Sequence, residues 1–160
     1  MNKEVVTNFW YEYKNQDGGP QKENISVVTN KLHPGLLRRN VWKVEILAMD
    51  ENQNILAKNK AKWHYDKNKK IRKVVSYRTD NYGVGLIGLF TQKKVQGIAA
   101  AMIAHTVYDL KIPEWYSSDV FSWQGEKMYS KTLKKYYSDL VEVSYVTNFL
   151  SGRYKLTPKN

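Results

Sequence analysis

A stretch that contains Gly and Lys, followed at once by an apolar helical pattern, holds the residues best suited to chemistry in this chain. It runs over residues 88–99 and reads GLFTQKKVQGIA. The N–H groups at the start of a helix and the positive end of its dipole bind anions readily. Gly97 lets a bulky phosphate approach the backbone, and Lys93 and Lys94 add positive charge beside it. The stretch predicts a phosphate site, although an ordinary helix start has the same pattern.

Two helices and a buried strand are expected to position this stretch. Residues 84–90 are nearly all apolar, as is typical of a strand that is buried on both faces. Residues 97–111 repeat apolar side chains at helical spacing. A second helix is expected from Trp123 to Tyr137, with Ser122 as its N-cap.

The rest of the chain has mainly the pattern of strands. Alternating apolar residues predict strands over residues 5–13, 42–46, 57–65, 71–78, 115–116 and 141–150. The lysines between the apolar residues of 57–65 predict a hairpin with one packed face and one wet, basic face. Residues 25–39 are ambiguous, and a short helix broken near Pro34 is one interpretation.

This order of elements predicts a single domain over residues 1–160. We expect an α/β (α+β) fold with a mixed, mostly antiparallel central sheet that is flanked by helices. The 160 residues, of which 42% are hydrophobic, are enough for one sizeable core. The chain has no cysteine, which excludes disulfides, thiolate metal sites and cysteine nucleophiles.

Two motifs resemble those of the GNAT superfamily of acyl-CoA N-acyltransferases. The pyrophosphate loop of that family reads Gln or Arg, two residues, Gly, any residue, then Gly or Ala. Residues 94–99, KVQGIA, match it at Gly97 and Ala99, while Lys94 replaces the Gln or Arg. Residues 125–129, GEKMY, are similar to a second family pattern of a small residue, two others, an apolar residue and a Tyr. Together the two motifs lie within residues 84–137, a third of the chain.

The resemblance implies a GNAT-like fold and the transfer of an acyl group from acetyl-CoA, or another acyl-CoA, to an amine. Backbone N–H groups of a splayed strand would hold the pantetheine arm, and here that strand is Leu89, Phe90 and Thr91. The loop residues expected to bind the cofactor are Lys93, Lys94, Val95, Gln96, Gly97, Ile98 and Ala99. The acceptor amine could belong to nucleic acid or protein, since some phage-borne members of the family modify such targets.

The same resemblance makes Tyr129 the candidate general acid, because the tyrosine of the family protonates the departing CoA thiolate. The alternative is a core tyrosine on the packed face of a helix. Asp119 and Glu45 are the candidate bases, and Asp119 could equally cap the helix that follows it. No metal site is expected, since the chain lacks closely spaced acidic pairs as well as cysteine.

The net charge of +11 predicts an anionic partner, such as a phosphate-rich cofactor, nucleic acid or an acidic protein. A stripe of Lys58, Lys60 and Lys62 is either a solvated sheet face or a set of phosphate contacts. The alternative function is therefore a non-enzymatic basic domain that binds nucleic acid or a host protein. We expect a cytoplasmic protein with no membrane partner, because signal-peptide and bilayer-spanning patterns are lacking. The oligomeric state is open.

Overall fold

A computed structural model describes residues 3–14, 19–81, 97–118, 123–147 and 152–160. The elements in chain order are β1 (Lys3–Lys14), β2 (Pro20–Pro34), β3 (Val41–Met49), β4 (Ile55–Tyr65), β5 (Ile71–Asn81), α2 (Ile98–Asp109), β6 (Trp115–Tyr116), α3 (Trp123–Lys127), η1 (Met128–Thr132), α4 (Leu133–Tyr136), β7 (Val141–Thr147) and β8 (Gly152–Pro158). α3, the π-helix η1 and α4 follow one another without a break and are called the helical run below.

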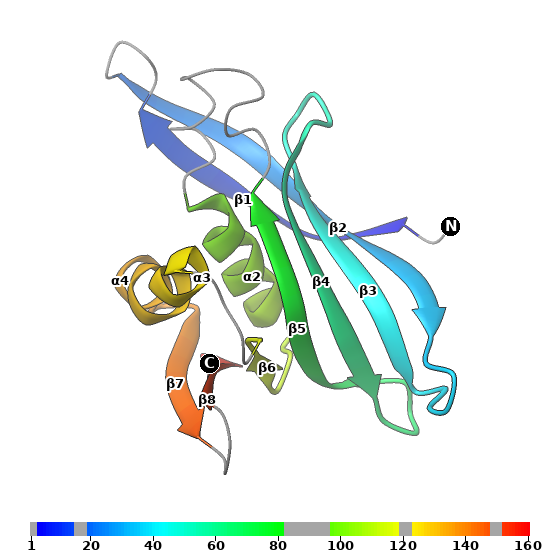
Figure 1. The fold of residues 1–160 in the computed structure, drawn as a ribbon. Coiled ribbons are helices and arrows are strands. Elements are labelled where there is room, and N and C mark those ends of the chain that lie inside the picture. Colours follow the sequence, from blue (N-terminus) through cyan, green and yellow to red (C-terminus); the bar gives the residue numbers. More distant parts are fainter. Residues whose placement is uncertain (1–2, 15–18, 82–96, 119–122, 148–151) are drawn as a thin grey trace.

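The described strands form one eight-stranded sheet with the order β1-β2-β3-β4-β5-β6-β8-β7. β1 to β5 are an antiparallel series in which each strand pairs with the next. The chain then passes through α2 and returns in β6, which is parallel to β5. β8 lies between β6 and β7 and is antiparallel to both. Figure 1 shows the long strands β1 to β5 on one side of α2, with β6, β7 and β8 at its lower end.

The two faces of β1 to β5 differ in character, because successive side chains of a strand point to opposite faces. The inner face, toward α2, carries buried residues such as Ile46, Ala57 and Val74. On β4 the lysines at 58, 60 and 62 alternate with these buried positions and lie on the outer face. The predicted hairpin with one packed and one basic face is therefore confirmed.

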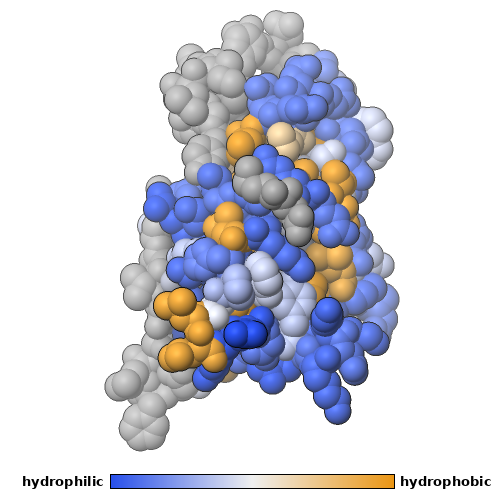
Figure 2. All heavy atoms as spheres, turned by 90° about the vertical axis from the view of Figure 1, so that its right-hand side faces the viewer, coloured by the Kyte–Doolittle hydropathy of each residue, from blue (hydrophilic) through white to orange (hydrophobic). Residues whose placement is uncertain are grey.

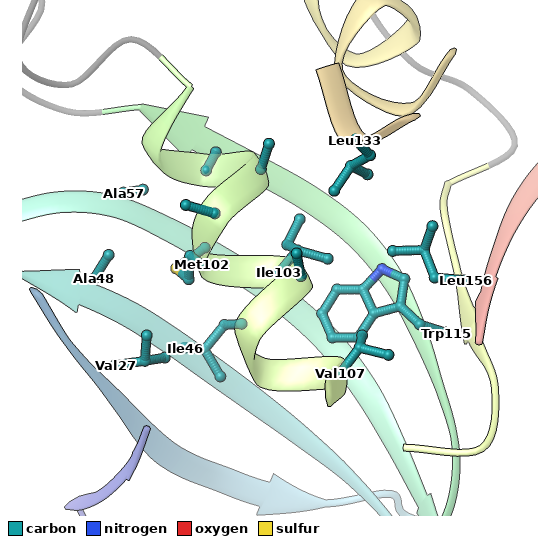
Figure 3. Packing of buried hydrophobic residues seen from close by; sticks show 14 of the residues in the cluster. Val27, Ile46, Ala48, Ala57, Met102, Ile103, Val107, Trp115, Leu133 and Leu156 are labelled. Atoms are coloured by element: carbon teal, nitrogen blue, oxygen red, sulfur yellow. The ribbon is translucent and has the colours of Figure 1, made fainter. Parts of the chain in front are cut away.

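α2 forms the centre of the core. Every residue from Ile98 to Ala104 is buried, and four of them are alanines, at 99, 100, 101 and 104. Figure 3 shows Met102 of α2 near Ile46, Ala48 and Ala57 of the sheet, and Ile103 and Val107 near Trp115. A helix that is apolar on all sides is buried on all sides. Small alanine side chains let such a helix lie close to the elements around it.

The expected α/β domain with a helix-flanked, GNAT-like sheet is wrong. Strands make up 56% of the described residues and helices 20%, so the sheet dominates. Residues 25–39, for which a helix was one interpretation, belong mostly to β2, which pairs with β1 and β3 along its length. In Figure 1 no described helix covers the outer face of β2 to β4.

The other predicted elements that fall on described residues are confirmed with small shifts in their bounds. The helix predicted over 97–111 is α2, and the helix predicted from Trp123 to Tyr137 is the helical run. The strand predicted over residues 84–90 lies outside the described residues. No described helix is both long enough and apolar enough to cross a bilayer.

Candidate functional site

The candidate cofactor residues lie where α2 begins. Gly97 immediately precedes α2 and has φ of 81°, in the left-handed region that favours glycine. Ile98 and Ala99 form the first turn of α2 and are buried. The remaining candidates, Leu89, Phe90, Thr91, Lys93, Lys94, Val95 and Gln96, lie outside the described residues, as does Asp119.

β5 and β6 are paired only briefly, toward the C-terminal end of α2, where Trp115 lies near Val107. Val74 pairs with Trp115 and Val75 with Tyr116, and the parallel ladder ends there. β5 continues to Asn81, and in the described structure its residues from Ser76 onward pair only with β4. On the other side, Ser117 turns to β8, where its N–H donates to the carbonyl of Tyr154 at 2.9 Å. Within the described residues the two strands therefore diverge beyond Val75 and Tyr116, and no described strand pairs with β5 on that side from Ser76 onward.

A chain of buried polar groups lies at the point of divergence. Trp115 Nε1 donates to the hydroxyl of Tyr129 at 3.1 Å, and that hydroxyl is also hydrogen bonded to Ser76. Asn59 Nδ2 donates to Ser76 Oγ at 2.7 Å. All four side chains are almost completely buried. Buried polar groups are costly unless they are hydrogen bonded, so this chain fixes the relative positions of β4, β5, β6 and the helical run.

One atom of this chain lacks a partner. Asn59 donates through Nδ2 to Thr79 and Arg78 as well as Ser76. Its carbonyl oxygen, Oδ1, is buried and accepts no hydrogen bond from the described residues. A buried acceptor of this kind normally has a protein or water donor. Asn59 Oδ1 is therefore a candidate acceptor for a donor group on a ligand.

Tyr129 lies in the π-helical turn of the helical run. Short π-helices often occur at functional sites. Its ring stacks on that of Tyr154, with the centroids 5.7 Å apart and the planes 6° from parallel. Burial raises the pKa of Tyr129 to about 12, and the hydrogen bonds from Trp115 and Ser76 oppose this shift. The phenol therefore stays protonated at neutral pH, as a general acid must, and it is at the same time a packed core residue.

Glu45 lies apart from Tyr129. Its neighbours Val44 and Ile46 are buried on the inner face, so Glu45 itself is on the outer face. Its carboxylate is 3.6 Å from Lys58 Nζ and 4.0 Å from Lys60 Nζ. The structure thus places this candidate base in an ion-pair cluster on the opposite face of the sheet from the Tyr129 hydroxyl.

Sequence reasoning missed Ser76, Asn59 and Trp115 as members of the site. Asn59 carried a usable signal, because it interrupts an otherwise apolar inner face between Ala57 and Ala61. Ser76 and Trp115 carried none, since only the pairing of β5 with β6 brings them to Tyr129. The described residues contain no group of three His, Cys, Asp or Glu side chains arranged to hold a metal ion.

Comparison with known proteins adds no relative to this description. No protein-family model matches the chain, and no curated protein matches it.

Proposed function

We propose that this protein binds an acyl-CoA and transfers its acyl group to an amine. The observation that carries the proposal is the end of the β5–β6 pairing part-way along α2, with the Tyr129 hydroxyl at that point, while β5 continues toward the start of α2. The edge of β5 from residue 76 onward offers backbone groups that an extended pantetheine arm can pair with, as a peptide pairs with an open sheet edge. The proposal depends on this local arrangement and on the two sequence motifs, and needs no helices on both faces of the sheet.

The start of α2 would hold the diphosphate. Its first N–H groups and dipole favour an anion, and Lys93 and Lys94 precede it in the sequence. Among the described residues, a side chain built on Gly97 would meet only the Tyr11 hydroxyl, at 3.8 Å. Asn59 Oδ1 supplies a buried acceptor for an amide N–H of the arm.

Tyr129 would supply the proton for the leaving group. The amine of the acceptor forms a bond to the thioester carbon, the C–S bond breaks, and the sulfur takes the phenolic proton of Tyr129. The proton that the amine gives up on becoming an amide then returns the Tyr129 phenolate to the phenol. A phenol with a raised pKa holds this proton at neutral pH and so has it available for the sulfur when the C–S bond breaks. Trp115 and Ser76 position the hydroxyl.

The matched pair Gly97→Asp and Gly97→Asn tests the diphosphate site. Asp and Asn have nearly the same shape and both tolerate the left-handed backbone, so the two variants differ mainly in one negative charge. We expect calorimetry to show acetyl-CoA binding to the wild type, weaker binding to Gly97→Asn, and at least a tenfold further loss in Gly97→Asp. Equal affinity of the two variants, or no heat with the folded wild-type protein, would refute the proposal.

A further inference from the structure

A second site lies at the opposite end of β3 to β5 from Gly97. A pocket of about 480 Å³ opens there, between the end of β2, the start of β3 and the turn that joins β4 to β5. Its size falls within the range of about 300–1,000 Å³ that is usual for small-molecule sites. Its lining combines two aromatic side chains, Trp42 and Tyr65, with four cationic ones, Lys31, Arg39, Lys67 and Lys69.

The aromatic side chains are held in place by the sheet. Trp42 pairs with Trp63 across β3 and β4, which places both on the inner face. Tyr65 follows at the end of β4, and its backbone N–H donates to the carbonyl of Asn40 at 2.9 Å. The Asn40 side chain returns a hydrogen bond to the Tyr65 carbonyl at 3.2 Å. These bonds tie the connection before β3 to the end of β4 and fix the walls of the pocket.

The cations of the pocket carry charge that no described carboxylate neutralises. None of the four forms an ion pair within the part of the chain that the structure describes. The one acidic lining residue, Asp66, accepts hydrogen bonds from the backbone N–H groups of Asn68 and Lys70 and so shapes the turn. This turn presents Lys67 and Lys69 to the pocket.

Lys31 links the aromatic and the cationic parts. Its Nζ lies 4.9 Å from the ring centroid of Tyr65 and 5.8 Å from that of Trp42. A base that stacks on these rings would displace the ammonium group from the ring faces. A phosphate attached to that base would give the displaced cation a stronger partner, since charge-assisted hydrogen bonds are strong.

Positive charge continues beyond the pocket, around the same end of the sheet. Burial lowers the pKa of His64, and the nearby Lys73, Arg72, Arg38 and Lys62 lower it further. A single nucleotide would not reach so wide a basic area, whereas a chain of phosphates would. Figure 2 views the molecule from the side of β2, β3 and β4 and shows a mainly hydrophilic surface with separate hydrophobic patches.

We propose that this pocket binds one unpaired nucleotide of a single-stranded nucleic acid, with its base on Trp42 or Tyr65 and its phosphates on Arg39, Lys67 and Lys69. Aromatic rings combined with a basic track are the usual means of holding single strands. A duplex lacks the exposed base that the rings require. The inference is independent of acyl-CoA binding, because the two sites lie at opposite ends of the strands.

An anionic membrane is the competing occupant of this surface. Leu36 and Leu37, in the connection between β2 and β3, are fully exposed at 102% and 99%. Exposed leucines beside cations suit insertion into a lipid surface. The pocket favours nucleic acid, because two aromatic rings that line a cavity serve a planar base and have no use in simple insertion into lipid.

Fluorescence anisotropy with a labelled 15-nucleotide oligo(dT), and the same sequence as RNA, tests the inference. We expect binding at 50 mM NaCl that weakens steeply by 200 mM, and about a 5- to 100-fold loss for Trp42→Ala. Because Trp42→Ala could disturb folding, a second variant, Lys67→Gln in the exposed turn, tests the phosphate contacts separately. Lys67→Gln should reduce the magnitude of the negative slope of log affinity against log salt by about 0.7, which is the contribution of one phosphate contact to a single strand. Lys131→Gln, an equal charge change on the exposed side of the helical run, should leave the slope unchanged.

Several results would overturn the inference. One is the absence of oligonucleotide binding by the folded protein at 50 mM NaCl. Another is an equal change of the salt slope in Lys67→Gln and Lys131→Gln. A third is a duplex that binds as tightly as the single strand. Binding to vesicles that contain anionic lipid, abolished by Leu36→Ser with Leu37→Ser while oligo(dT) does not bind, would assign the surface to a membrane instead.

Discussion

At the scale of single residues, the central feature is the hydroxyl of Tyr129. It accepts from Trp115 Nε1 and is hydrogen bonded to Ser76, inside a region from which water is excluded. The same side chain is thus a candidate general acid and a structural residue. The two roles are compatible, since a catalytic proton donor must be held in one position by its surroundings.

Tyr129→Phe should lower the free energy of unfolding by about 1–3 kcal/mol, because it leaves the buried Trp115 N–H without its acceptor. Urea unfolding measures this loss. Tyr136→Phe is the matched control: its side chain is 63% exposed, and its loss should stay within about 0.5 kcal/mol. Equal losses in the two variants would mean that the Trp115–Tyr129 hydrogen bond does not contribute to stability.

Some of the residues of the site could be predicted from the sequence, and others could not. Gly97 was found because a helix start after Gly and Lys has a recognisable pattern, and its positive φ agrees with a requirement for glycine. Tyr129 was found from a five-residue motif. Ser76 and Trp115 were missed, because their importance comes from strand pairing between segments 39 residues apart in the chain, such as 76 and 115.

At the scale of elements, β1, α2 and the helical run meet at His105 of α2. The imidazole stacks on Phe9 of β1, with centroids 4.4 Å apart and planes 3° from parallel. The ring of Tyr137, just after α4, meets the imidazole edge-on, with the ring centroids 6.2 Å apart. Burial lowers the pKa of His105, and Asp109 and Asp139 only partly oppose this. The neutral ring therefore joins the three elements.

This lowered pKa predicts that acid destabilises the fold. The unfolded chain takes up a proton at His105 near its ordinary pKa of about 6.5, while the folded protein resists it until a lower pH. The free energy of unfolding should therefore fall as the pH drops from 7.5 to 5.5. His105→Phe keeps a stacked ring without the titration, so its free energy of unfolding should fall less over this range. If the stability of His105→Phe fell as steeply with pH as that of the wild type, His105 would not be the source of the pH dependence.

The elements themselves were largely predictable, with one exception. Helical spacing gave α2, and two-residue alternation gave β3 and β4. Residues 25–39 are the exception: they were ambiguous, with a short helix broken near Pro34 as one interpretation, and most of them lie in β2, to which β1 and β3 provide hydrogen-bond partners on both sides. Such long-range pairing overrides a weak local preference.

At the scale of the whole molecule, one sheet carries two candidate sites at its two ends. β5 begins near the basic pocket and ends near the start of α2, so the same strand contributes to the surroundings of both. The sequence predicted a sheet with helices around it, and the structure has a much larger sheet, with the lysines of β4 on its outer face. Composition gave the charge of +11 but could not show that four of the cations line one pocket.

Hydrogen exchange with and without saturating acetyl-CoA tests the central claim most directly, because it shows where the ligand binds. We predict slower exchange of the backbone amides at residues 76–81 of β5 and in the first turns of α2, where the open strand edge and the helix start lie. Slower exchange confined to residues 31–42 and 65–69, around the basic pocket, would show that the nucleotide part of CoA binds there instead. That result, or unchanged exchange throughout, would contradict the proposed acyl-CoA site.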